Sequence, residues 1–412
     1  MNKRMNRERL NVGAYYLRPY AQTREHVKDV KDCGIDFITC LDHNRAVLDL
    51  FAEYGLGAVV LNVVPSWWGG NGDNAGTMTE TNPLYAYEAA ADAFEDHPAI
   101  WGIDTGDEPS ALDFPHYGKV IDLVNRRFVN QFPYLNLYPN YASVAANTSE
   151  QTVNQLGTAT YEEHIAQYVK HVPTDYICYD FYVYSLVDAD RPLEAAVEKA
   201  FHNLWTVADA CRDTGRSMWI VLQVNSDDIN VKISLNRMRF QAYTAMAFGA
   251  ETIIWACYTK GWWHHNVLDE SGNKTEQYDK LCLMNQELHN LGDAYMRFRR
   301  TSTHFIGFPA HMRCACQAYS DGFIKELRAE NGTPLICGAM VGRNCADHAY
   351  MLCSCDDPAD AHPGVNPVTF QTNGRTAILH MADGSRKVLQ PSNGVCRFEL
   401  MSNHGVLLEI CE

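Results

Sequence analysis

Short apolar runs alternate with amphipathic stretches along the first three quarters of the chain. Eight of these runs are rich in β-branched and aromatic residues: NVGAYYL, IDFITCL, LGAVVLNV, AIWGIDTG, YLNLYPN, YICYDFYV, SMWIVLQVN and TIIWACYT. Their hydrophobicity is continuous rather than alternating, which is typical of parallel strands buried on both faces. Between them lie stretches of helical periodicity, several of which end in the Gly preferred just past a helix C-terminus. About eight strand–helix units in roughly 300 residues predict a (β/α)8 TIM barrel, an α/β fold.

A different pattern begins near position 300. The segment TEQYDKLCLMNQELHNLGDAYMRFRR predicts the closing helix of the barrel, because its apolar residues recur at helical spacing. These residues are Met284, Leu288, Leu291 and Tyr295. Beyond this segment, the strand candidates TPLICGAMVG, HAYMLCSC, RTAILHMA and GVLLEI are separated by turns rich in Gly, Asn, Asp and Pro. We therefore expect two domains, a catalytic barrel over residues 1–300 and a C-terminal antiparallel β-sandwich over residues 301–412.

The charge of the chain limits its partners. The 412 residues carry a formal net charge of -16, with 50 acidic against 34 basic residues. No run of Lys or Arg could follow a phosphate backbone or an anionic lipid surface, so we expect neither nucleic acid nor a membrane as partner. The N-terminal residues lack the apolar stretch of an export signal, and no apolar run is long enough to span a bilayer. We therefore expect a cytoplasmic protein.

The 14 cysteines are expected to be reduced thiols in such a protein. Cys314 with Cys316, and Cys353 with Cys355, are separated by one residue, which places both sulfur atoms on one face of a strand. Zinc sites use a gap of two or more residues between cysteines. We therefore interpret both pairs as core packing and expect no metal ion.

The fourth predicted strand ends in two adjacent acids, within the segment AIWGIDTGDEPS. The active site of a (β/α)8 barrel lies at the C-terminal ends of its strands, and this is where Asp107 and Glu108 fall. Strand alternation places Asp104 and Glu108 on one side and Asp107 on the other, so we expect Glu108 to face the barrel mouth. The alternative is that the acids only cap the following helix, whose N-terminus favours negative charge.

The other predicted strand ends are rich in side chains that bind polyols. Aromatic faces stack on the apolar faces of sugar rings, while amides and carboxylates satisfy sugar hydroxyl groups. Two Trp-Trp pairs, in PSWWGG and KGWWHH, lie in glycine-flanked loops and are hard to explain as core. The candidate substrate-binding residues are His43, Asn62, Trp67, Trp68, Asp107, Asn140, Tyr182, Gln223, Tyr258, Trp262 and Trp263. Further polar groups at strand ends are Asn136, Tyr138 and Asn225.

The order of five motifs resembles the β-galactosidase-like barrels of glycoside hydrolase clan A. The motifs are GDEP on the fourth strand, NLYPNY on the fifth, YDFY on the sixth, RFQAYTAMAFGAETIIWACY leading into the eighth, and DESGNKTEQYDKLCLMNQEL after it. The resemblance implies that Glu108 is the general acid/base, although Asp107 precedes it where the clan usually has Asn. It also implies a Glu nucleophile at the end of the seventh strand, where this chain has Gln223.

We therefore expect a glycoside hydrolase that cleaves a small glycoside or oligosaccharide and needs no cofactor. Glycoside hydrolysis uses one carboxyl group as the acid and a second as nucleophile or base. Glu108 is the expected acid. Asp180, at the end of YICYD, is the best-placed second carboxylate, because Asp227 and Asp228 lie farther into a loop.

Two other classes of protein stay open. A metal-dependent sugar isomerase or epimerase on the same barrel would use Glu108, Asp180 and His43 as ligands, together with His264 or His265. A non-catalytic carbohydrate-binding protein descended from an enzyme would explain the missing Glu on the seventh strand. The sequence leaves open the sugar, its linkage, the anomeric configuration, the stereochemical course and the oligomeric state, including a homo-oligomer.

Overall fold

A computed structural model of the chain describes residues 3–70, 72–142, 155–188, 190–361 and 364–411. The chain forms two compact units. The first comprises Met1–Arg7, Asn11–Val231 and Thr252–Tyr278, and the second comprises Glu8–Leu10, Lys232–Glu251 and Asp279–Glu412. The domain boundary between residues 300 and 301 stays a prediction.

Eight parallel strands close into a barrel, each hydrogen-bonded to its neighbours in chain order. The strands are β1 Asn11–Tyr15, β2 Phe37–Asp42, β3 Gly57–Leu61, β4 Ile100–Asp107, β5 Phe132–Leu137, β6 Tyr176–Asp180, β7 Ser217–Gln223 and β8 Ala250–Ala256. Every one of the eight apolar runs overlaps one of these strands. The predicted (β/α)8 barrel is therefore confirmed.

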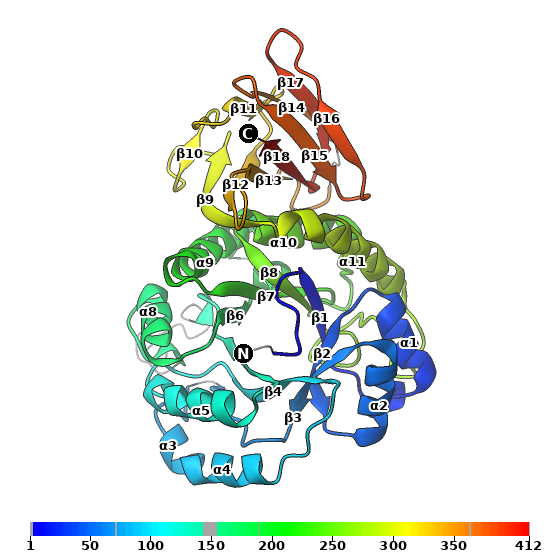
Figure 1. Ribbon diagram of the computed structural model, residues 1–412, viewed down its shortest axis with the longest axis vertical. Helices are drawn as coiled ribbons and strands as arrows, with labels where there is room; N and C mark the ends of the chain where they lie inside the picture. Colours follow the sequence, from blue (N-terminus) through cyan, green and yellow to red (C-terminus); the bar gives the residue numbers. More distant parts are fainter. Residues whose placement is uncertain (1–2, 71, 143–154, 189, 362–363, 412) are drawn as a thin grey trace. The chain divides into compact units, whose positions relative to one another are not determined.

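Helices surround the ring of strands in the first unit (Figure 1). They are α1 Arg24–Asp32, α2 Arg45–Tyr54, α3 Met78–Thr81, α4 Leu84–Asp92, α5 Phe114–Arg127, α8 Tyr161–His171 and α9 Leu193–Thr214, with the short 3-10 helices η1 Pro19–Ala21 and η2 Val183–Leu186. Local sequence sets their ends. The Asn44 side chain accepts a hydrogen bond from the Ala46 N–H at the start of α2, and Gly55 ends that helix at a φ of 67°, a conformation that glycine adopts without strain.

Large aromatic side chains fill the barrel interior, and glycines make room for them. A Cβ atom added to Gly57 would lie 2.1 Å from the Trp101 ring, so only glycine fits there. Near the N-terminal ends of the strands, Met5 joins the interior cluster and is 3% exposed. The Arg7 guanidinium lies 5.6 Å from the centroid of the Trp219 ring, within cation–π range. The N-terminal segment thus covers the end of the barrel opposite to the strand C-termini.

Two β-sheets form most of the second unit. A seven-stranded sheet has the order β10-β9-β12-β13-β18-β15-β16, and a three-stranded sheet has the order β11-β14-β17. All the pairings are antiparallel except that of the two-residue β10 with β9. The strands are β9 Phe298–Ile306, β10 Ala315–Cys316, β11 Lys325–Ala329, β12 Leu335–Gly342, β13 His348–Ser354, β14 Val365–Gln371, β15 Thr376–Met381, β16 Arg386–Leu389, β17 Cys396–Met401 and β18 Gly405–Cys411.

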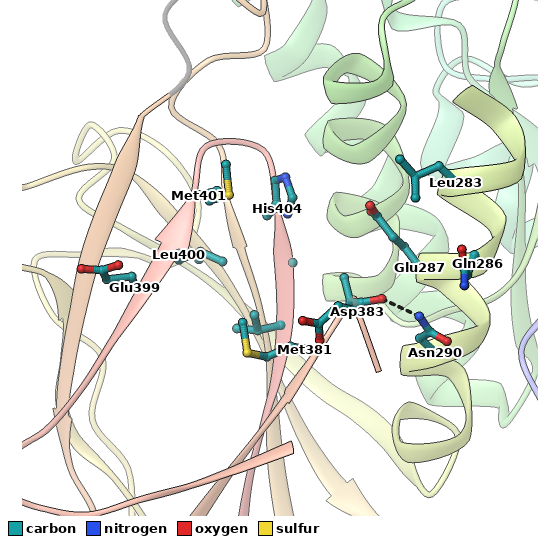
Figure 2. A pocket seen from close by; sticks show the side chains of 13 residues that line it. Leu283, Gln286, Glu287, Asn290, Met381, Asp383, Glu399, Leu400, Met401 and His404 are labelled. Atoms are coloured by element: carbon teal, nitrogen blue, oxygen red, sulfur yellow. Dashed lines mark hydrogen bonds between the residues drawn. The ribbon is translucent and has the colours of Figure 1, made fainter. Parts of the chain in front are cut away.

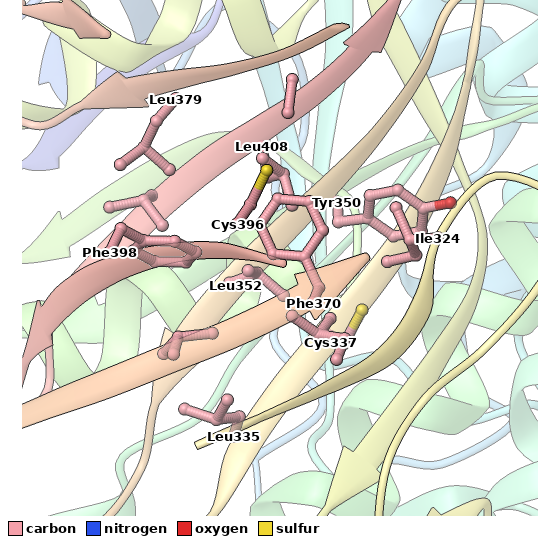
Figure 3. Close-up of a cluster of buried hydrophobic side chains, with 14 of the residues drawn as sticks. Ile324, Leu335, Cys337, Tyr350, Leu352, Phe370, Leu379, Cys396, Phe398 and Leu408 are labelled. Atoms are coloured by element: carbon pink, nitrogen blue, oxygen red, sulfur yellow. The ribbon is translucent and has the colours of Figure 1, made fainter. Parts of the chain in front are cut away.

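Buried side chains from both sheets form one core, which includes Leu352, Phe370, Phe398 and Leu408 (Figure 3). The predicted C-terminal β-sandwich is therefore confirmed. The second unit also contains helix α10, Leu235–Ala247, and most of helix α11, Glu276–Tyr295. Helix α11 is the predicted closing helix.

All 14 cysteines are free. Cys353 and Cys355 are buried with their sulfur atoms 3.6 Å apart, as core packing requires. The same interpretation is wrong for Cys314, which is exposed because it lies in the turn before β10 at a φ of 55°. Within the described ranges, none of the helices combines the length and the apolar character needed to cross a membrane.

Candidate active site

Acidic side chains gather at the C-terminal end of the barrel, at the ends of β4 and β6, the two neighbours of β5. Asp107 ends β4, Glu108 follows it, and Asp180 ends β6. Asn136 of β5 lies between the two strands, and its Nδ2 donates to Oδ1 of Asp180 at 2.8 Å and to Oδ1 of Asp107 at 3.1 Å. The second oxygen of Asp180 accepts a hydrogen bond from the Tyr141 hydroxyl at 3.1 Å. One amide thus holds two carboxyl groups from different strands next to each other.

An irregular backbone at the end of β4 brings both neighbouring acids into this site. Gly106 and Glu108 have φ values of 138° and 47°, and the register between β4 and β5 shifts between Asp104 and Asp107. A Cβ atom on Gly106 would lie 2.4 Å from the carbonyl oxygen of Trp67, so glycine is required there. The simple alternation that we expected for this strand end is therefore wrong. It stops at Gly106 because of the bulge.

The charges of these acids act on one another. Burial raises the pKa of Asp180 to about 7, the charge of Asp107 adds to the rise, and hydrogen bonds from Asn136 and Tyr141 oppose it. Burial raises the pKa of Asp107 to about 6, against its hydrogen bond from Asn136. Burial and the charges of Asp180 and Asp107 raise the pKa of Glu108 well above its usual range. Near neutral pH, Glu108 therefore keeps its proton beside carboxyl groups that can ionise, a combination that suits acid and base catalysis.

Asp104 is a fourth acid close to this group. Its side chain is 5% exposed, and Oδ1 accepts the Gly106 N–H at 3.1 Å. The thiol of Cys40 donates to its other oxygen at 3.7 Å. Burial and the charge of Asp107 raise the pKa of Asp104 to about 8, so it is protonated at neutral pH. Asp104 therefore adds little negative charge to the site.

The tryptophan pairs in the loops differ in exposure. Trp68 is 61% exposed and lies close enough to Glu108 to lower the pKa of that carboxyl group, whereas Trp67 is only 6% exposed. Trp262 is 42% exposed and Trp263 is half-buried. Both lie against Tyr182, with ring centroids at 6.2 and 4.6 Å. Trp68 and Trp262 thus offer open ring faces, while Trp67 is packed.

Two other predicted binding residues use their side-chain amides for hydrogen bonds within the protein. Gln223 is fully buried, where its Oε1 accepts the Tyr184 N–H at 2.8 Å and its Nε2 donates to Oγ of Ser185 at 2.9 Å. The side chain of Asn140 donates to the Lys199 carbonyl oxygen at 3.1 Å, on helix α9. The structure therefore gives these two amides packing partners that compete with a sugar.

The remaining predicted residues, as far as the structure describes them, make no bond to the acids. Tyr258 is fully buried, and its backbone N–H donates to the Tyr15 carbonyl oxygen. His43 and Asn62 are exposed beyond the ends of β2 and β3. In the described part of the chain, neither residue makes a hydrogen bond or ion pair with Asp107, Glu108 or Asp180.

Two residues of the site were missed by sequence reasoning in the role they have here. The sequence identifies Asn136 only as an amide at a predicted strand end. Nothing in the sequence indicates that it donates hydrogen bonds to two acids at once. Tyr141 closes the motif NLYPNY, which offered it as part of a resemblance and not as a partner of Asp180.

A group of three side chains that could ligate a metal lies among the described residues. The group of three whose ligand atoms approach one another within 4.8 Å is Asp347, Glu409 and Cys411. It lies in the β-sandwich, and Glu409 there already pairs with Arg297 and with His380. Among the described residues, the ligand set of the isomerase alternative, Glu108, Asp180, His43 and His264 or His265, does not form such a group.

The second unit contains a cavity of its own, of about 370 Å³, between α11 and the ends of β15, β17 and β18 (Figure 2). Two of the polar side chains that line it already have partners within the protein. Glu287 binds the Arg239 guanidinium and accepts a hydrogen bond from the Tyr243 hydroxyl at 2.8 Å. Asn290 donates to the Ala382 carbonyl oxygen at 2.8 Å. None of the sequence-predicted site residues lines this cavity.

No protein-family model matches the chain, and no curated protein matches it. Solved structures with a similar fold include an Anoxybacillus α-amylase whose structure is described as giving insights into a new glycosyl hydrolase subclass. It is 9% identical over 98% of both chains, with a TM-score of 0.53. A putative α-L-fucosidase from Bacteroides thetaiotaomicron is 11% identical over 70% of this chain and 95% of its own, with a TM-score of 0.47. The likeness to the amylase shows a shared fold.

Proposed function

We propose that the protein is a glycoside hydrolase that acts on a small glycoside or oligosaccharide. The observation that carries the proposal is that the amide of Asn136 binds both Asp107 and Asp180, and that the charges of these two acids act on Glu108. Such a group, at the C-terminal end of a (β/α)8 barrel, provides the acid and the second carboxylate that glycoside hydrolysis requires. The order of the strand-end motifs supports a place in clan A.

In this proposal Glu108 is the general acid. It donates its proton to the glycosidic oxygen while the bond from that oxygen to the anomeric carbon breaks. Asp180 is the second carboxylate, and it either attacks the anomeric carbon or takes a proton from the attacking water. Its hydrogen bonds from Asn136 and Tyr141 favour the ionised form that both roles need.

The exposed faces of Trp68 and Trp262 are the proposed stacking surfaces for the sugar. Because the Trp68 side chain lies close enough to Glu108 to affect its pKa, the first stacking surface is next to the proposed acid. The rings of Trp263 and Tyr182 contact each other, and Trp263 also contacts Trp262, the second stacking surface. We also propose a cytoplasmic location, which the free thiols support.

The test is a panel of 4-nitrophenyl glycosides that covers the common hexoses, pentoses and deoxyhexoses in both anomeric configurations. We expect release of nitrophenolate from at least one of them by the wild type and a large loss of this activity in Glu108→Gln. Absence of turnover on all of them, and on short oligosaccharides assayed by chromatography, would contradict the proposal.

One observation favours a second candidate, a carbohydrate-binding protein without catalysis. Gln223 occupies the strand end where the resemblance implies a nucleophile, and its side chain is fully buried and hydrogen-bonded. Calorimetric titration with the same sugars separates the two candidates. Binding accompanied by turnover supports the hydrolase, whereas binding without turnover supports the binding protein.

A further inference from the structure

Arg18 follows strand β1 at the same end of the barrel as the acids. Its backbone N–H donates to Oγ1 of Thr259 at 3.1 Å, and that hydroxyl donates to the Tyr16 carbonyl oxygen at 3.0 Å. The Lys260 N–H donates to the Tyr20 hydroxyl at 3.0 Å. These bonds tie the segment that carries Arg18 to the loop after β8, so the position of its backbone is well defined.

The side chain of Arg18 is also held in place. Its Nε–H donates to the Lys260 carbonyl oxygen at 2.9 Å, and its guanidinium lies 3.9 Å from the centroid of the Tyr16 ring. The ring of Tyr16 covers one face of the Arg18 guanidinium, and the hydrogen bond at Nε occupies one edge. The two terminal nitrogens, Nη1 and Nη2, are not used by either contact. Among the residues that the structure describes, these nitrogens make no hydrogen bond, and Arg18 has no acid within ion-pair distance. A fixed guanidinium with a free edge is well suited to bidentate recognition of an anion.

A chain of ring contacts connects Arg18 to the acids. The Tyr16 ring lies 5.8 Å from the ring of the exposed Trp262, and Trp262 lies 6.2 Å from Tyr182. The Tyr182 hydroxyl is close enough to Asp180 for the two groups to interact electrostatically. Arg18 thus lies beyond the platform that we assign to the sugar, with the platform between it and Asp180.

The neighbouring cation Lys260 does not share these properties. Lys260 is half-exposed and pairs with Glu270 at 2.8 Å, so its charge is already neutralised. When ionised, Asp107 and Asp180 repel an anionic group elsewhere in the site, since like charges in a region of low dielectric constant cost free energy. An unpaired cation beside the Trp262 platform therefore determines where an anionic group on a sugar can be placed.

We propose that this site selects sugars that carry an anionic substituent, a carboxylate or a sulfate, which the terminal nitrogens of Arg18 bind while the ring stacks on Trp262. The inference rests on the proposed function and deepens it by naming the substrate class. Arg18 acts here on specificity and takes no part in the chemistry, so its loss affects KM for anionic substrates.

The test compares matched 4-nitrophenyl glycosides of one sugar in three forms: neutral, with a C6 carboxylate, and with a C6 sulfate. We expect the wild type to prefer one of the two anionic forms, and the preferred form tells a carboxylate from a sulfate. Arg18→Gln should lower kcat/KM on that form by about 10- to 100-fold, mainly through KM, as the loss of a charged hydrogen bond predicts. Arg18→Lys keeps the charge but not the two parallel N–H donors of the guanidinium. Its kcat/KM on the anionic form should therefore lie between those of the wild type and Arg18→Gln.

Lys260→Gln is the matched control, because it removes a cation from the adjoining loop that already has an acidic partner. It should leave the preference for the anionic form unchanged. The same fold-change on neutral and anionic forms in Arg18→Gln, or a wild type that prefers the neutral form, would overturn the inference.

A binding experiment keeps this inference separate from the proposed function. Tryptophan fluorescence is titrated with D-glucuronate, D-galacturonate, their neutral parent sugars and the 6-sulfates of those sugars. Tighter binding of an anionic sugar that Arg18→Gln abolishes supports the anionic subsite even where no glycoside is hydrolysed. Equal affinity for neutral and anionic sugars contradicts the subsite even in an active hydrolase.

Discussion

Asn136 and Asp180 are joined by a hydrogen bond of 2.8 Å, donated by the side-chain amide of Asn136. The same nitrogen donates to Asp107 at 3.1 Å. The two accepting oxygens can therefore be no farther apart than the sum of these two distances. Asn136 holds two acids at short range and lowers the pKa of each below the value that burial alone would give.

The first prediction concerns this amide. In Asn136→Ala both carboxyl groups lose a donor that favours their ionised form, so the pKa of each rises. Because Asp180 must be ionised, the acid limb of the profile of kcat/KM against pH should move upward by about one pH unit. Asn140→Ala is the control, since the Asn140 amide donates to the Lys199 carbonyl oxygen and not to the acids. An acid limb that stays in place in Asn136→Ala would show that the amide does not tune the reaction.

The second prediction is that Glu108→Gln folds normally and loses about 10²- to 10⁴-fold in kcat, the usual contribution of general acid catalysis. The loss should be greatest on glycosides with poor leaving groups, which depend most on protonation. The exposed Glu80→Gln serves as the control for removal of one acid. A wild-type rate of Glu108→Gln on an unactivated substrate would remove Glu108 from the mechanism.

The third prediction compares the two tryptophans of one pair. Trp67 is 6% exposed, so Trp67→Ala should reduce the free energy of unfolding by about 3–5 kcal/mol. Trp68 is 61% exposed, so Trp68→Ala should change stability by less than about 1 kcal/mol and weaken sugar binding instead. Trp68→Phe keeps an aromatic face but removes the indole N–H and one of the two fused rings, so its loss of sugar binding should be smaller. Denaturant unfolding and calorimetric titration of the three variants measure both effects, and equal loss of stability in the two Ala variants would contradict this division.

The fourth prediction concerns stability and pH at Asp104. Its pKa is about 8 in the folded protein and about 4 in an unfolded chain. The folded state therefore binds this proton more tightly, so Asp104 costs nothing below about pH 4 and destabilises the fold increasingly as the pH rises towards about 8. Asp104→Asn cannot ionise and should melt at a higher temperature than the wild type at pH 8. At pH 4 the two proteins should melt at the same temperature. A difference in melting temperature that is equal at pH 4 and pH 8 would contradict the prediction that Asp104 is buried in its neutral form.

The sequence predicts the barrel well because the pattern of an apolar run followed by an amphipathic helix is repeated along the chain. Each of the eight strands is an apolar run, so a single ambiguous segment does not change the fold. The β-sandwich is predicted less completely, because strands such as β11 and β17 are short and bury only two and three residues, respectively. Their pairing partners lie far away in the chain, and only the folded structure brings them together.

The site was harder to predict because strand ends do not follow the alternation of the strand. Gly106 and Glu108 both have positive φ values, which end the alternation, and no motif in the sequence marks either conformation. Gln223 is at a strand end and still points into the protein, because Tyr184 and Ser185 satisfy its amide. Arg18, in YYLRPY, carries no motif at all. Its significance depends on which donors the fold leaves free.

The central claim is that Asp180 provides the second carboxylate of a glycoside hydrolase. The most direct measurement is single-substrate kinetics of the wild type and Asp180→Asn on the best glycoside of the panel, with thermal melting of both proteins. The account predicts that Asp180→Asn melts as a folded protein and loses at least about 10²-fold in kcat. An Asp180→Asn protein that hydrolyses the same glycoside at the wild-type rate would contradict it.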